Sequence, residues 1–166
     1  MTRPEQPYPR KRRGPILLFL SWVLHDVEEA ATFPATCDYL ADRTGFESLR
    51  MNSRQSWAAV GLMGTLVGFA CVRGARTEGR SQLYRAVTAG LEGHVFTHLA
   101  ASAVTRRYTA GVVSALPVML PGTRAASQEL SRDNRPLTTK DRALGSAVLI
   151  PAALACHLIV RTIMKR

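Results

Sequence analysis

The sequence predicts an all-α protein, a multi-span transmembrane helical bundle with about five spans. Two observations predict it: 46% of the 166 residues are hydrophobic although the formal net charge is +10, and the basic residues cluster between apolar runs. Basic loops that flank apolar spans are typical of membrane proteins. A basic nucleic-acid-binding domain would instead gather its charge on one face or element, so we expect the lipid bilayer, and no nucleic acid, as a partner. The mean hydropathy of −0.01 is low for a membrane protein, which leaves a soluble helical bundle as the alternative.

Five apolar segments approach the length of about 20 residues that a helix needs to cross a bilayer. The second segment carries no charge, whereas Pro117 and Pro121 interrupt the fourth, and Pro34 is expected to close the first. We expect one membrane-embedded domain over 15–164 after a basic tail at 1–14, and a solvated loop over 125–142. The predicted spans lie near 15–33, 56–72, 81–105, 108–123 and 143–164.

Lysine and arginine residues favour one orientation of these spans. They are more frequent in the tail, the second loop and the fourth loop than in the segments on the opposite side. The positive-inside rule therefore places the N-terminus in the cytoplasm and the chain in the cell membrane, as a multi-pass protein of a bacterial inner membrane. Residues 10–20 also resemble the start of a signal peptide, but acidic residues follow them where a cleavage site would need small ones, so we expect the segment to be retained.

All four histidines of the chain lie in predicted spans, together with several carboxylates. Ionisable residues inside a membrane are costly and usually functional. Residues at i, i+3 and i+4 share a helix face, so His25, Glu28 and Glu29 project together, and Asp26 is interpreted as a spacer that points elsewhere. His94 and His98 form a second such pair in the third span.

Converging imidazoles and carboxylates at a matching depth suit a divalent metal, either zinc or non-haem iron or manganese. We expect His25, Glu29, His94 and His98 as metal ligands, with Glu28 and Glu29 as the catalytic groups, because a carboxylate beside a metal-bound water is a suitable general base. A hydrogen-bonded cluster that only holds helices together and a proton relay are the alternatives. Whether His157 and Glu92 join the site stays open.

The motif also resembles a known family. His25-Asp26-Val27-Glu28-Glu29, with Phe33-Pro34 after it, is similar to the first signature of the HXXEE-domain family of bacterial integral membrane proteins, which is largely uncharacterised. His98-Leu99 and the turn Tyr108-Thr109-Ala110-Gly111, followed by Leu116-Pro117, resemble the second signature. The resemblance covers about residues 17–120 and departs from the pattern at Ala110, where the family has proline. It implies a multi-span membrane protein with His25, Glu28, Glu29 and His98 at its site, and no established reaction.

These observations predict a metal-dependent enzyme that acts on a lipid-like or otherwise membrane-accessible substrate. A small proton-coupled transporter or accessory protein is the first alternative, because the same residues suit proton transfer. A non-catalytic membrane scaffold is the second. The sequence does not predict the substrate, the choice between hydrolysis and oxidation, or the oligomeric state.

Overall fold

In a computed structural model that describes residues 12–164, the chain is helical and contains no strand over that range. The predicted all-α class is therefore confirmed. Residues 1–11 of the predicted basic tail lie outside the described residues, and the first helix begins at Gly14. The elements are α1 (Gly14–Thr44), η1 (Glu47–Leu49), α2 (Ser53–Arg76), α3 (Gln82–Thr105), α4 (Val112–Ser114), η2 (Ala115–Met119), α5 (Leu120–Arg132) and α6 (Thr139–Ile163).

Helix α1 continues for ten residues beyond Pro34, so the predicted end of the first helix at this proline is wrong. Proline has no backbone N–H, and its presence leaves the carbonyl four residues earlier without its helical partner. That carbonyl belongs to Ala30, and the Ser56 hydroxyl of α2 donates a hydrogen bond of 2.8 Å to it. Because a neighbouring helix satisfies the freed group, the helix tolerates the proline.

The segment predicted as a fourth span at 108–123 has different boundaries. Residues 108–111 are not helical, and the following α4, η2 and α5 form one consecutive helical stretch that ends at Arg132. Its middle part, η2, is a π-helical turn around Pro117, as expected where proline interrupts the regular bonding pattern. The predicted loop over 125–142 is therefore helical as far as Arg132 and again from Thr139, where α6 begins.

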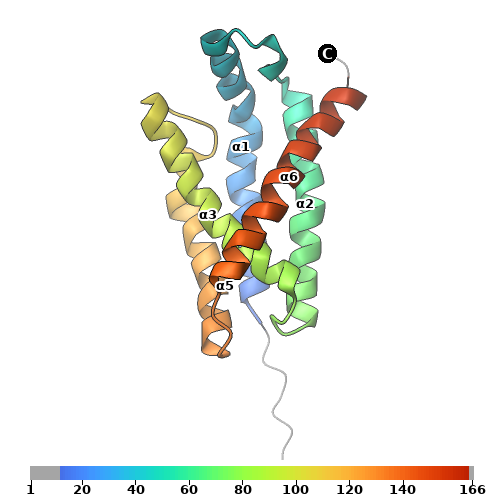
Figure 1. The fold of residues 1–166 in the computed structure, drawn as a ribbon, viewed down its shortest axis with the longest axis vertical. Coiled ribbons are helices and arrows are strands. Elements are labelled where there is room, and N and C mark those ends of the chain that lie inside the picture. The colour runs from blue at the N-terminus through green and yellow to red at the C-terminus, as the bar shows by residue number, and fades with distance from the viewer. Residues whose placement is uncertain (1–11, 165–166) are drawn as a thin grey trace, which may run out of the picture.

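Close backbone contact joins α3 to α6, which cross each other in Figure 1. A Cβ atom on Gly145 would lie 2.4 Å from the Ala86 carbonyl oxygen and 2.6 Å from the Gly90 nitrogen. Only glycine permits this approach. The crossing fixes the position of α3, which carries two of the four histidines.

The core lies between α1, α2, α3 and α5, where Leu18, Trp22, Val67 and Tyr84 are buried. Capping boxes start two helices: Asn52 with Gln55 begins α2, and Thr138 with Asp141 begins α6. These caps satisfy backbone N–H groups that have no partner inside the helix.

Two of the described helices, α2 and α6, are long and apolar enough to cross a membrane, with mean hydropathies of 1.5 and 2.1 over their best windows. Such evidence rests on length and composition, and two helices do not establish the five predicted spans. Helices α1 and α3 carry the histidines and carboxylates of the candidate site, which lower their apolar character.

Candidate metal centre

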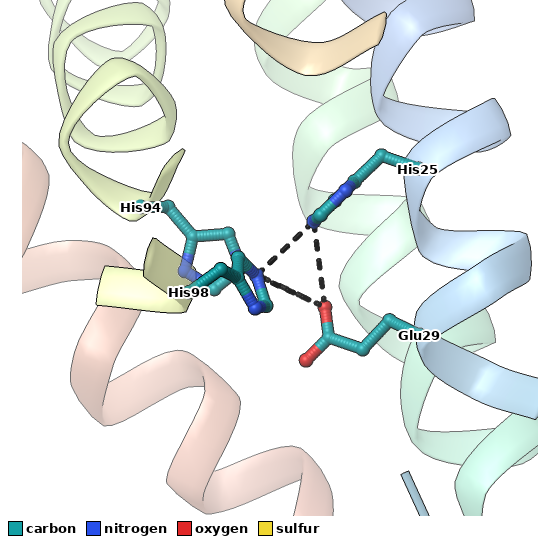
Figure 2. A group of neighbouring side chains, drawn as sticks. All are labelled: His25, Glu29, His94 and His98. Carbon is teal, nitrogen blue, oxygen red and sulfur yellow. Dashed lines mark hydrogen bonds and ion pairs between the residues drawn. The ribbon is translucent and has the colours of Figure 1, made fainter. Parts of the chain in front are cut away.

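Helices α1 and α3 bring four of the predicted residues together. Figure 2 shows His25 and Glu29 on α1 facing His94 and His98 on α3. His98 Nε2 lies 3.1 Å from His25 Nε2 and 2.8 Å from His94 Nε2. The Oε2 atom of Glu29 lies 3.8 Å from His25 Nε2, 3.6 Å from His94 Nε2 and 3.8 Å from His98 Nε2.

These separations fit four ligands around one small cation. One donor atom from each of the four side chains lies within 4.8 Å of every other. Metal–nitrogen distances of about 2.0–2.1 Å in a tetrahedral arrangement put donor atoms roughly 3.3 Å apart. Small rotations of these side chains would therefore place all four donors around one ion.

The hydrogen bonds around His25 determine which of its nitrogens is free for a metal. Its Nδ1 lies 2.9 Å from Ser114 Oγ, and the Ser114 hydroxyl itself donates to Glu28. Because that hydrogen is already used, the imidazole must donate from Nδ1 to Ser114 Oγ. A neutral His25 then presents a bare lone pair at Nε2.

His94 is held in the same form by a different residue. The Thr97 hydroxyl donates to the His94 carbonyl at 2.7 Å, and His94 Nδ1 lies 3.3 Å from Thr97 Oγ1. In the tautomer that donates from Nδ1 to Thr97, the His94 Nε2 lone pair also faces the cluster. Two nitrogens without hydrogen and a carboxylate oxygen thus lie around His98 Nε2. This nitrogen carries at most one hydrogen, so it can donate a hydrogen bond to only one of these three acceptors.

Glu28 has a different position from the one expected on the shared helix face. Its carboxylate accepts hydrogen bonds from the backbone N–H groups of Val113 and Ser114, at 3.2 and 2.7 Å, and from Tyr108 Oη at 2.6 Å. Glu28 is thus bound to the segment before η2 and reaches the cluster only through Ser114.

Gly111 packs directly against the cluster. Its φ is +79°, and a Cβ atom there would lie 2.7 Å from His98 Cε1 and 2.9 Å from His25 Cε1. Both the left-handed backbone and the lack of space require glycine. The neighbouring Ala110 donates its N–H to Thr36 Oγ1 at 3.0 Å, a bond that the proline expected here from the resemblance could not make.

The other ionisable residues of the predicted spans lie outside the group of four. Glu92 pairs with Arg142, at 3.0 Å between Oε2 and the guanidinium. His157 stacks on Phe33, with 5.0 Å between the ring centroids. Asp26 also lies outside the group of four, and it is buried. It lines a cavity together with Glu29, His94 and His157.

A family model for proteins of unknown function with the HXXEE motif matches residues 16–126. The chain belongs to this family. The five-residue motif that gives the family its name supplies His25 and Glu29 to the cluster, and Glu28 to the hydrogen bonds behind it. Comparisons with curated proteins and with solved structures gave no match.

Sequence reasoning missed the residues that orient the ligands, above all Ser114 and Thr97. Ser114 follows Gly111 by one helical turn, and no spacing rule connects it to His25, which lies 89 residues earlier. Thr97 lies three residues after His94, so helix periodicity could have indicated it. That His25, Glu29, His94 and His98 hold a metal, and that Glu28 and Glu29 are catalytic, stays a prediction.

Proposed function

We propose that this HXXEE protein is an integral membrane enzyme whose His25, Glu29, His94 and His98 hold a catalytic divalent metal ion. The observation that carries the proposal is the convergence of three imidazole Nε2 atoms and one carboxylate. The bonds from Nδ1 of His25 and His94 leave their Nε2 lone pairs directed at one point. A cation at that point would accept the lone pairs of all these atoms, whereas a single hydrogen on His98 can be donated to only one of them.

Exposed apolar stripes support a position in the membrane. On α1, Ile16, Leu20 and Leu24 follow each other at intervals of four residues and are all more than half exposed. On α6, Ile150, Leu154 and Leu158 form a similar stripe. Exposed apolar patches of this kind are rare on soluble monomers. We place the chain in a bacterial inner membrane as a multi-pass protein with a cytoplasmic N-terminus, as the distribution of basic residues predicts.

The ligand set favours zinc, iron or manganese over magnesium or calcium, because three of the four donors are imidazoles. Such an ion, if bound, would act as a Lewis acid and would lower the pKa of a water bound to it. Glu29 lines the cavity beside the cluster, so its carboxylate is placed to bind the ion or to take a proton from that water. Glu28 orients His25 through Ser114, which makes it a positioning residue in this proposal, in place of the catalytic role expected from the sequence.

Metal analysis of the purified protein tests the proposal. We expect one equivalent of metal per chain, lost in His25→Ala and in His98→Ala. His157→Ala is the matched control, because it removes a histidine from a helix of the same bundle but from outside the cluster. Protein that folds normally and contains no metal after growth with zinc, iron or manganese would contradict the proposal, and so would equal metal content in all variants.

Proton transfer is the second candidate function, and one specific observation favours it. An unbroken series of polar contacts runs from Tyr108 through Glu28 and Ser114 to His25, and then through His98 to His94. Tyr108 is 47% exposed, so the series begins at the protein surface. Proton uptake by reconstituted vesicles that is lost in Tyr108→Phe, in protein that holds no metal, would favour this candidate.

A further inference from the structure

Beside the cluster lies a cavity of about 380 Å³. Helices α1, α2, α3 and α6 all contribute to its wall, which is mostly apolar. This volume is at the lower end of the range of small-molecule sites. The wall includes Trp22, Phe33, Ala59, Val60, Met63, Leu91, Leu149, Ile150, Ala153 and Leu154.

Seven polar residues line this wall, and two of them belong to the cluster. Glu29 and His94 line the cavity as well as facing the candidate metal position. An occupant of the cavity would therefore lie next to any ion bound there. A mostly apolar cavity with a few convergent polar groups is the usual form of a ligand site.

Asp26 is one of the polar residues of the wall that the proposed metal centre does not use; Ser56, Ser146 and His157 are others. It is 93% buried, since its exposed fraction is 7%, and it lines the cavity. Its Oδ2 atom is buried and accepts no hydrogen bond from any residue in 12–164. An acceptor buried without a donor is costly, so a ligand that brings a donor into the cavity gains affinity there.

We propose that this cavity is the substrate chamber of the centre and binds a single-chain amphiphile whose head group donates a hydrogen bond to Asp26. The inference rests on the proposed metal-dependent function, because it names the substrate class of that centre. The apolar wall takes the hydrocarbon chain. The head group lies at the end where Asp26, Glu29 and His94 meet. The head is a hydroxyl group, because an uncharged donor is repelled neither by the carboxylates of the wall nor by the proposed cation beside them.

The limited volume and the composition of the rim support a single chain that enters from the bilayer. Ile150 and Leu154 line the cavity and are 61% and 59% exposed. They belong to the apolar stripe of α6 that we place against lipid. A chain dissolved in the bilayer could therefore reach the cavity without crossing water.

Tryptophan fluorescence offers a direct measurement, because the chain has two tryptophans and only Trp22 lines the cavity. Trp22 is 5% exposed, whereas Trp57 is 46% exposed. In Trp57→Phe protein reconstituted into lipid nanodiscs, we expect 11-bromo-1-undecanol to quench Trp22 fluorescence with a saturable dose dependence. 1-Bromoundecane should bind roughly tenfold more weakly, the difference that one hydrogen bond to a buried carboxylate provides.

Two further probes identify the head group. 11-Bromoundecylamine tests the ammonium group and 11-bromoundecanoate tests the anion. Preference for the alcohol over the other three probes supports the proposal. Equal binding of the bromoalkane, or strongest binding of the amine or of the carboxylate, overturns it. In Asp26→Leu the preference for the donor head should disappear while the alkane still binds.

Two glycines provide a matched pair of variants for the chamber itself. A Cβ atom on Gly93 or on Gly61 would meet no other atom within 4 Å, and only Gly93 lines the cavity. We expect Gly93→Leu to fill the cavity and weaken quenching by the alcohol at least about tenfold, because a filled site loses the apolar burial of the chain. Gly61→Leu should leave quenching unchanged, and equal effects of the two substitutions would overturn the proposal.

The metal content of the same samples separates this inference from the proposed function. Saturable quenching in His25→Ala protein would support the chamber even if no metal were found. A metal-loaded protein whose Trp22 fluorescence no probe quenches would retain the metal centre and overturn the chamber.

Discussion

His25 Nε2 lies 3.1 Å from His98 Nε2, although 73 residues separate the two histidines in the sequence. His25 donates from Nδ1 to Ser114, so its Nε2 has no hydrogen to offer. His98 Nε2 faces a second nitrogen, that of His94, at 2.8 Å. Three nitrogen atoms that converge in this way cannot all hydrogen-bond to one another. They are better suited to bind one cation together.

Ser114→Ala is expected to weaken metal binding by about 10- to 100-fold, the usual effect of removing a residue that orients a histidine ligand. The substitution removes the acceptor for His25 Nδ1, so the ring loses its preference for one orientation and one tautomer. Competition with a chromophoric chelator measures the change. Ser131→Ala, which removes an exposed hydroxyl bonded within α5, should leave the affinity unchanged. An unchanged affinity in Ser114→Ala would contradict the role of Ser114.

Gly111→Ala should destabilise the protein and reduce metal binding together. A left-handed backbone costs a non-glycine residue roughly 1–2 kcal/mol, and the new Cβ would also displace His98 and His25. Gly45→Ala is the matched control, because Gly45 has a φ of +76° and no atom within 4 Å of the added Cβ. Thermal unfolding should show a loss in both variants, whereas metal titration should show a loss in Gly111→Ala alone. Equal metal affinity in the two variants would exclude a packing role for Gly111.

Ser56→Ala is expected to lower the free energy of unfolding by about 1–3 kcal/mol, because it leaves the buried Ala30 carbonyl without a donor. In a Pro34→Ala background the new backbone N–H of residue 34 can take that carbonyl, so the same substitution should cost less. A double-mutant cycle of thermal unfolding measures the coupling between Ser56 and Pro34. Strictly additive effects would show that Ser56 does not compensate for the proline.

The helices and the ligand cluster could be predicted largely from the sequence. The i, i+4 pairs on α1 and α3 indicated His25 with Glu29 and His94 with His98, and the structure brings both pairs together. Apolar runs indicated where the helices lie, because a helix that is buried and a helix that contacts lipid are both mostly apolar along their length. The sequence was sufficient to predict those features that depend on residues within one turn of the same helix.

Features that depend on a distant residue could not be predicted. The continuation of α1 through Pro34 depends on Ser56 of another helix. The start of α4 after Gly111 depends on Glu28, which lies 85 residues before Val113. Helix geometry placed Asp26 off the face of His25 and Glu29, but its burial comes from elements that pack against α1, such as α2 and α5. In each case the partner is supplied by tertiary packing and leaves no local pattern.

Glu28→Ala and Glu29→Ala should have separable effects, although the two residues are adjacent in the motif. Glu28 accepts the N–H groups of Val113 and Ser114, which otherwise have no partner at the start of a helix. Its removal should lower the free energy of unfolding by about 1–3 kcal/mol, since the buried Ser114 N–H loses its partner, and should speed hydrogen exchange in residues 108–114. Glu29 faces the three histidines instead, so Glu29→Ala should weaken metal binding while exchange in 108–114 stays slow. Hydrogen exchange followed by mass spectrometry, with metal titration of the same samples, measures both effects. If the two variants behave alike in both measurements, the division of the motif into one ligand and one positioning carboxylate is wrong.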